Sequence, residues 1–213
     1  MQSTLPMFGS FAAKKISGKV KAPIAWRIQN ALHLNYIRGW LAFHIVRHIA
    51  RWFGLATMIA TLEIRKFDAA LHQWVDYGVV SYRVVTDAGV AAMADDFTDA
   101  SAEITNFKYH GCGTGTGAEA VGDTTLTECT TALNPDSTRA TGTNTNPTAP
   151  VYRSVGTLTF DADTAVTEHG IFSQAATGGG TLWDRSKFTA INVVGASGDS
   201  IQFTYSLTLT SGG

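Results

Sequence analysis

The chain has 213 residues, of which 45% are apolar, and its formal net charge is -1. A chain of this length and apolar content can bury a core, so complete disorder is excluded. It contains two cysteines, Cys112 and Cys129, which form neither a CxxC pair nor a zinc-ligand spacing. The sequence therefore indicates neither a disulfide framework nor a structural zinc site.

The small net charge conceals two halves of opposite sign. Residues 1–75 contain ten Lys and Arg against two acidic residues, a formal charge of +8, whereas residues 76–213 contain six basic and fifteen acidic residues, a formal charge of -9. Of the 21 glycines, 17 also follow residue 75. This asymmetry predicts two parts with separate tasks, a basic and aromatic N-terminal arm at 1–75 and a Thr/Gly-rich domain at 76–213.

Residues 1–22 mix Gly, Ser and Lys with scattered apolar residues, which predicts an extended leader and not a secretory signal. The stretch 39–62 is apolar, but it contains His44, Arg47, His48 and Arg51 near its middle. A helix that spans a bilayer would bury those charges at high cost, so we do not expect one. A helix that lies in a lipid interface is an alternative.

From about Pro23 the apolar spacing becomes helical. One stripe repeats at every fourth residue from Ile37 to Phe53, and an adjacent stripe runs from Trp40 to Trp52. A helix that is apolar over more than half of its circumference must pack on its own domain, on another subunit or on lipid. Its aromatic content suits a protein interface edged by arginine better than a nucleic-acid site. The residues predicted to bind a partner are Trp26, Ile37, Arg38, Trp40, Leu41, Ile45, Arg47, Ile49, Arg51, Trp52 and Phe53.

The second half has the composition of a β domain. We predict strands at 77–86, 104–110, 151–161, 165–173, 187–194 and 199–210, with a short helix capped by Thr86 or Asp87 that ends near Phe97. In the last strand, five large residues from Ile201 to Leu209 alternate with polar ones, so one face is expected to be buried. Residues 134–150 contain three prolines and predict a long exposed loop, which either contacts a partner or is a surface excursion. The expected fold is mainly β, a jelly-roll-like β-sandwich preceded by an α-helical arm.

Two motifs could carry binding chemistry. The glycine-rich GCGTGTG at 111–117 follows a predicted strand, but it lacks the Lys-Ser/Thr ending of a phosphate-binding loop, so a turn is favoured over a nucleotide site. His44 and His48 lie four residues apart on a helix and could approach one metal ion, but no third ligand is evident. Stacking against the neighbouring tryptophans is the favoured interpretation.

Candidate catalytic groups are equally sparse. Glu168 and His169 are adjacent on a predicted strand, so their side chains are expected on opposite faces and not in one site. Asp184 and Arg185 are expected to fix a turn or a subunit contact, and no triad order includes Cys112. The sequence therefore predicts no enzyme activity, no cofactor, and no catalytic or metal-binding residue.

A resemblance to a known family rests on two segments, NFKYHGCGTGTGAEAVGDTTL at 106–126 and TEHGIFSQAATGGGTLWDRSKFTAINVVGASGDSIQFTYSLTLT at 167–210. They resemble a family of small structural proteins of tailed-phage particles. The resemblance covers roughly 76–213 and leaves out the arm. It implies a place in a virion and brings no catalytic residues.

Within that family we expect a capsid cement or decoration protein on the capsid surface, which binds major capsid subunits or other virion proteins. The arm is then a particle-anchoring extension, and a homo-oligomer with many points of attachment is expected. A tail, neck or fibre component is the first alternative, although neither heptads nor repeats are visible. A membrane-interacting protein is the second.

Overall fold

The computed structural model describes residues 20–98 and 104–211, so residues 1–19 of the predicted leader lie outside the described part of the chain. Strands account for 46% of the described residues and form two open sheets of seven and four strands that pack together, with helices at the N-terminal end of the described part. The fold is thus a strand-rich mixed α/β architecture in two layers, and its strand order does not show a jelly roll.

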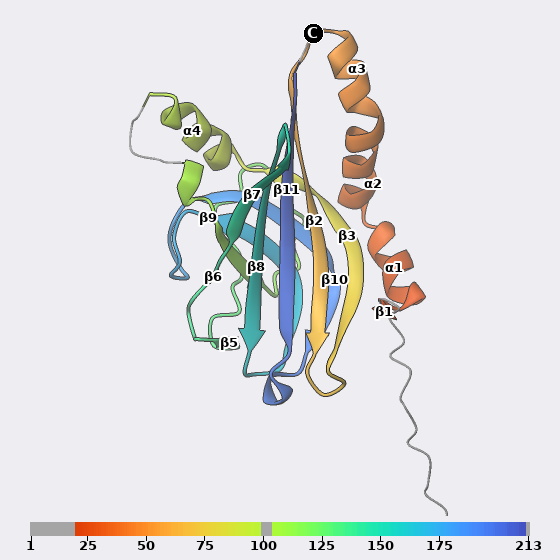
Figure 1. Cartoon of the computed structure of the whole chain (residues 1–213), viewed down its shortest axis with the longest axis vertical. Helices are drawn as coiled ribbons and strands as arrows, with labels where there is room; N and C mark the ends of the chain where they lie inside the picture. Colours follow the sequence, from red (N-terminus) through yellow and green to blue (C-terminus); the bar gives the residue numbers. More distant parts are fainter. Residues whose placement is uncertain (1–19, 99–103, 212–213) are drawn as a thin grey trace, which may run out of the picture.

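The larger sheet runs in the order β5-β8-β11-β2-β3, with β7 added to β8 and β1 added in parallel to β3. The smaller sheet runs β10-β9-β4-β6, and β3 also pairs with the start of β10, which links the two layers. Figure 1 shows the two layers face to face. The strands are β1 (Val20–Lys21), β2 (Thr57–Asp68), β3 (Gln73–Val85), β4 (Tyr109–Gly113), β5 (Leu133–Asn134), β6 (Ala140–Thr141), β7 (Thr143–Thr148), β8 (Val151–Phe160), β9 (Thr164–Phe172), β10 (Leu182–Val193) and β11 (Ser200–Thr210).

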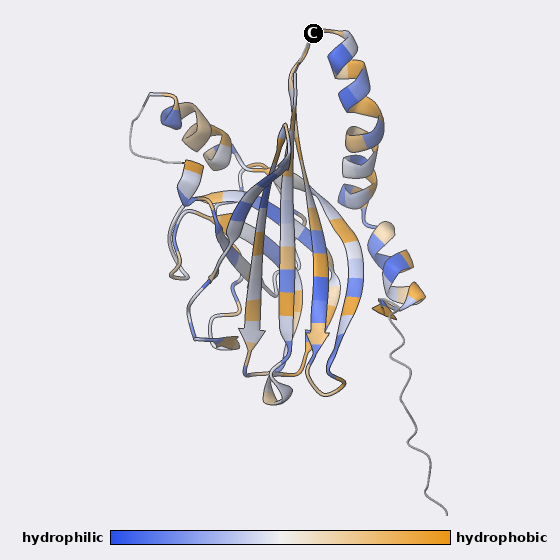
Figure 2. Ribbon diagram, in the orientation of Figure 1, coloured by the Kyte–Doolittle hydropathy of each residue, from blue (hydrophilic) through white to orange (hydrophobic). Residues whose placement is uncertain are grey.

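The core lies between the two sheets and follows from the alternation of side chains along the strands. Leu62 and Ile64 of β2 and Phe203 of β11 meet Phe188 and Ile191 of β10 in one buried cluster. The alternating hydropathy is visible along the strands of the larger sheet (Figure 2). The prediction for the last strand is confirmed at four of its five large residues; the exception, Leu209, is exposed near the end of β11.

The helices occupy two places. Helices α1 (Ile24–Ala31), α2 (Leu34–Leu41) and α3 (Arg47–Trp52), with a π-helical turn at Ala42–Val46 between the last two, form a column beside β3 (Figure 1). Helix α4 (Asp87–Asp96) follows β3 and begins as predicted, because the Thr86 hydroxyl accepts a hydrogen bond from the Gly89 amide at 3.0 Å. Short 3-10 helices occupy Ile104–Asn106 and Gly195–Ser197.

Several predicted boundaries differ from the structure. A division at residue 75 would cut through β3 and would separate β2 from the sheet, because the helices end at Trp52 and the first long strand begins at Thr57. The strand predicted at 104–110 is in part the 3-10 helix at Ile104–Asn106, with β4 starting only at Tyr109. The loop predicted at 134–150 contains β6 and β7, and the exposed β7 pairs with β8 at the edge of the sheet.

Candidate functional site

The helical column is attached to the domain first at the seam between the two sheets, where β3 of the larger sheet lies next to β10 of the smaller one. Strand β3 has a bulge around Val80, and β10 has an irregularity between Lys187 and Ile191, so backbone groups there lack partners within the ladders. Asn30 of α1 supplies them: its Nδ2 donates to the Val80 carbonyl at 2.7 Å, and its Oδ1 accepts from the Thr189 amide at 2.8 Å. A single buried side chain thereby connects both sheets to α1.

Trp26 adds a second attachment at the same seam. Its indole Nε1 donates to the Ala190 carbonyl at 2.9 Å, and its ring meets the edge of Tyr77 with 4.7 Å between centroids. Trp26 is half-buried, so this residue of the predicted partner-binding set is engaged within its own chain. The seam explains why α1 lies along β3 and β10 and does not extend away from the domain.

Helix α2 approaches β3 closely at a glycine. A Cβ at Gly39 would collide with Tyr82, so only glycine allows the backbone of α2 to come this near. The rings of Tyr36 and Phe43 flank Tyr82 with centroid separations of 5.3 Å and 5.6 Å. Burial, followed by the nearby hydroxyl of Tyr36, raises the pKa of Tyr82 to about 12.

The remaining circumference of the column faces outward. The predicted stripe is exposed, with relative exposures of 47% for Ile37, 51% for Ile49 and 92% for Trp52. The partner-binding set therefore divides. Trp26 and Arg47 are half-buried, Arg47 over the Phe43 ring at 4.4 Å, and the exposed members are Ile37, Arg38, Trp40, Leu41, Ile45, Ile49, Arg51, Trp52 and Phe53.

The exposed apolar area extends further than the sequence predicted. Ile24, Ile28, Leu32 and Leu34 are also exposed, and they continue the area onto α1. Ile24, Ile28 and Leu32 have the same four-residue spacing as the predicted stripe, so the sequence could have identified these three. We call the exposed large apolar side chains from Ile24 to Phe53 the exposed helical surface.

This surface is strongly basic at its edges. The sequence contains no Asp or Glu before Glu63, whereas Arg27, Arg38 and Arg51 are all exposed on the helices. The surface therefore joins apolar area to positive charge that no acidic residue of the helices offsets. Such a surface complements a partner that is apolar and acidic.

The two helical histidines serve the packing of the column. The His44 ring lies 4.8 Å from that of Trp40 but is tilted against it by 42°, so the two rings are in contact without the expected stacking, and His44 Nε2 is 3.5 Å from the Tyr82 hydroxyl. His48 Nε2 lies 3.4 Å from Arg47 Nε. Within residues 20–98 and 104–211, no group of three or more His, Cys, Asp or Glu side chains could hold a metal ion.

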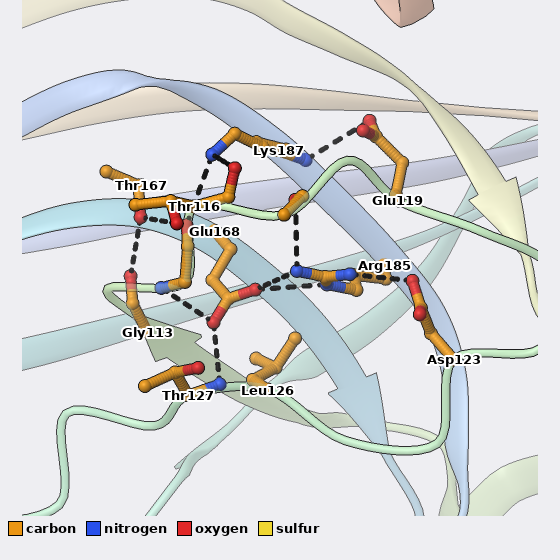
Figure 3. A network of polar contacts seen from close by, with 12 residues as sticks. Gly113, Thr116, Glu119, Asp123, Leu126, Thr127, Thr167, Glu168, Arg185 and Lys187 are labelled. Carbon is orange, nitrogen blue, oxygen red and sulfur yellow. Dashed lines mark hydrogen bonds and ion pairs between the residues drawn. The ribbon is translucent and has the colours of Figure 1, made fainter.

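A buried polar network lies elsewhere, on the outer side of the smaller sheet (Figure 3). The buried Glu168 carboxylate accepts hydrogen bonds from Arg185 Nη2 at 2.6 Å and from the amides of Gly115 and Thr127 at 3.0 Å and 2.7 Å. Arg185 also pairs with Asp123 at 2.7 Å. These contacts are internal, so Arg185 holds the segment 114–128 against the sheet, and neither a turn nor a subunit contact is needed to explain it.

The glycine-rich motif is explained by the same network. A Cβ at Gly113 would meet the Thr127 carbonyl and the Glu168 carboxylate, and a Cβ at Gly115 would meet that carboxylate too. The glycines thus let the backbone reach Glu168. Gly111 and Gly113 belong to β4 and Gly115 is buried directly after it, so the turn that the sequence favoured for 111–117 is wrong for the first half of the motif.

Glu168 and His169 point to opposite faces of β9, as predicted. His169 lies in the core, where its ring stacks on Phe203 and its Nε2 is 3.0 Å from Nδ1 of His110. His110 Nε2 in turn lies 3.0 Å from the Ser154 hydroxyl. All three polar residues are fully buried, so this chain of contacts joins the two sheets from inside.

Three comparisons with known proteins bear on identity. No protein-family model, curated protein or solved structure matches the chain. No helix within the described ranges is both long enough and apolar enough to cross a bilayer.

Proposed function

We propose that this chain is a non-enzymatic structural protein of a tailed-phage particle, a capsid cement or decoration protein that binds major capsid subunits through its helical column. The observation that supports this most directly is the exposed helical surface. Large apolar side chains cover it over three consecutive helices, although the same helices are anchored to the domain on their other side. An apolar area of this kind on a folded domain marks an interface.

Charge favours a protein partner with an acidic and apolar surface. The helices carry only basic charges, and exposed tryptophan and arginine are the residues that contribute most to protein interfaces. A cement protein gains from such a surface because each copy attaches at several subunit boundaries, and copies arranged in a homo-oligomer multiply the effect. A tail, neck or fibre component would use the same surface and is the first alternative.

A membrane-interacting protein is the second alternative, and one observation favours it. Trp40 and Trp52 are exposed beside Arg38 and Arg51, a combination that also suits the boundary of an anionic bilayer. The segments that resemble phage proteins contain β4, most of β9, and β10 of the smaller sheet, and β11 of the larger sheet. The resemblance favours the virion as the location.

The test is co-sedimentation of the purified protein with particles that lack it. Ile45→Glu with Ile49→Glu should weaken attachment at least about tenfold, because both side chains lose their apolar contact and introduce charge of the wrong sign. The matched control is Leu71→Glu with Val90→Glu, which changes two exposed apolar residues outside the column. Equal attachment of the two double variants would contradict the proposal.

One further variant tests the charge of the surface, and two binding measurements separate the alternatives. Arg38→Glu with Arg51→Glu should weaken attachment most at low salt, where charges are least screened. Binding of the wild-type chain to vesicles containing anionic lipid, in preference to particles, would support the membrane alternative. Attachment confined to isolated tails would support the tail component.

A further inference from the structure

The two cysteines face one another across a small antiparallel pairing. Cys112 belongs to β4, and Cys129 lies where the segment 114–128 returns to the same strand. Gly113 and Glu128 form an antiparallel bridge, and the Cys129 amide donates to the Cys112 carbonyl at 3.0 Å. Directly opposed residues of such a pair have Cα atoms about 5.5 Å apart, within the range that a disulfide spans.

Both thiols also point to the same place. Each is a free cysteine, and both belong to the buried cluster between the sheets. A hydrogen bond between the two side chains raises the pKa of Cys112, with burial adding to the effect, and lowers the pKa of Cys129. Cys129 is also the less deeply buried of the two, so it is the thiol that more readily becomes the thiolate.

The segment between the cysteines has a structural task. Its two ends supply the amides of Gly115 and Thr127 to the buried Glu168 carboxylate, and its middle supplies Asp123 to Arg185. If the segment detached, a buried ion pair would be left with part of its partners missing. A covalent link between Cys112 and Cys129, which lie just before and just after this segment, would hold the network closed.

We propose that Cys112 and Cys129 form an intramolecular disulfide when the folded protein meets an oxidising environment, and that this bond fastens the segment 114–128 over the smaller sheet. The oxidant is a small-molecule disulfide. The Cys129 thiolate attacks it, forming a mixed disulfide and releasing one thiol; Cys112 then loses its proton, attacks the Cys129 sulfur and releases the second thiol. The two cysteines lose two electrons and two protons, and the small disulfide is reduced to two thiols.

This bond has a natural place in a protein that is made in a reducing cytosol and later leaves it. The dithiol permits the segment to fold around Glu168 first, and oxidation then fixes the result. The proposal does not depend on which partner the exposed helical surface binds.

The test treats the full-length folded protein with oxidised glutathione and then blocks the remaining free thiols. The wild-type chain should lose both free thiols and two hydrogen atoms without adding glutathione. Cleavage after Glu119, which lies between the cysteines in the sequence, should then yield two peptides joined by a bond that a reductant breaks. Oxidation should raise the melting temperature by on the order of 5–10 °C, since it closes a loop of fewer than twenty residues.

For Cys112→Ala and for Cys129→Ala, the melting temperature is measured before and after treatment with the oxidant. Each variant serves as its own reference because either substitution alters the core. Neither variant should gain thermal stability on oxidation. The proposal is overturned if the folded wild-type chain keeps two free thiols, carries two separate glutathione adducts or forms only bonds between chains. It is also overturned if the internal bond forms and the melting temperature does not rise.

Discussion

Replacing Asn30 by leucine tests whether the seam between the sheets depends on α1. Leucine has nearly the shape of asparagine but makes neither of its two hydrogen bonds, so the Val80 carbonyl and the Thr189 amide would be left buried without partners. Each unsatisfied group costs about 1–3 kcal/mol, so the loss of both should lower the free energy of unfolding by about 2–6 kcal/mol. For a chain of this size, that corresponds to a melting temperature lower by on the order of 10 °C.

Urea denaturation of Asn30→Leu, together with hydrogen exchange at the Thr189 amide, measures both the total and the local effect. The matched control is Gln29→Leu, which makes the same kind of change at an exposed position of the same helix. Asn30→Asp should be at least as damaging as Asn30→Leu, because it places a carboxylate against the Val80 carbonyl oxygen. If Asn30→Leu and Gln29→Leu unfold at the same urea concentration, α1 does not hold the seam and the reasoning is refuted.

Three other predictions concern internal contacts. Glu168→Gln should lower the free energy of unfolding by about 3–5 kcal/mol in urea denaturation, because it leaves a buried guanidinium without one of its carboxylates. Burial alone would raise the pKa of Asp199, but hydrogen bonds from Lys66 and two backbone amides outweigh this effect and lower the pKa below 3.8. The ionised Asp199 therefore stabilises the fold above pH 3.8, and this stabilisation is lost as the pH falls through the lowered pKa. Asp199→Asn should accordingly flatten the acid branch of a plot of melting temperature against pH. Gly39→Leu should displace α2 from Tyr82 and should accelerate trypsin cleavage within the helices.

Each of these changes has a matched control at an exposed or open position. Glu63→Gln alters an exposed carboxylate of β2, and Asp161→Asn alters an exposed carboxylate between β8 and β9, so neither should reproduce the effect of its buried counterpart. Gly117→Leu adds the same side chain as Gly39→Leu where no atom lies within 4 Å of the new Cβ. If a control variant changes the measured property as much as its test variant does, the contact named for that test variant is not the cause of the change.

The strands with clear alternation were predictable from the sequence. The strands predicted at 151–161, 165–173 and 199–210 agree with β8, β9 and β11 to within one residue at each end. In these strands one face packs in the core and the other faces solvent or a polar layer, so the period of two is visible in the residue types. The Thr86 cap was predictable for a similar reason, because capping depends on only a few neighbouring residues.

Strand β2 was missed although its pattern is regular. Ala60, Leu62 and Ile64 are buried, and the residues between them are more polar. The prediction assigned this stretch to the arm because its positive charge and apolar content continue those of the helices without a break. Charge distribution describes the surface, however, whereas a strand in the middle of a sheet is defined by its neighbours. For β2 these are β3, which follows it in a hairpin, and β11, which is far away in the sequence.

The site was predictable in part. Helical spacing identified the apolar stripe from Ile37 to Phe53, but it could not decide which face the domain covers. That choice depends on Gly39 and Tyr82, whose contact requires the position of β3. The pairing of Glu168 with Arg185 was inaccessible for the same reason, because it follows from the register between β9 and β10 and not from local sequence.

The position of β11 has a consequence for how the protein is made. Thr57, the first residue of β2, pairs with Thr210, the last residue of β11, and β11 also separates β2 from β8. During synthesis β2 therefore emerges long before β11, and the edge of β2 that β11 will cover stays unpaired. The residues of the exposed helical surface have all emerged by then. Pairings between such distant segments fold slowly and leave aggregation-prone edges open in the meantime. Chaperones that shield the nascent chain until its last strand emerges should therefore determine how much of this protein is recovered folded.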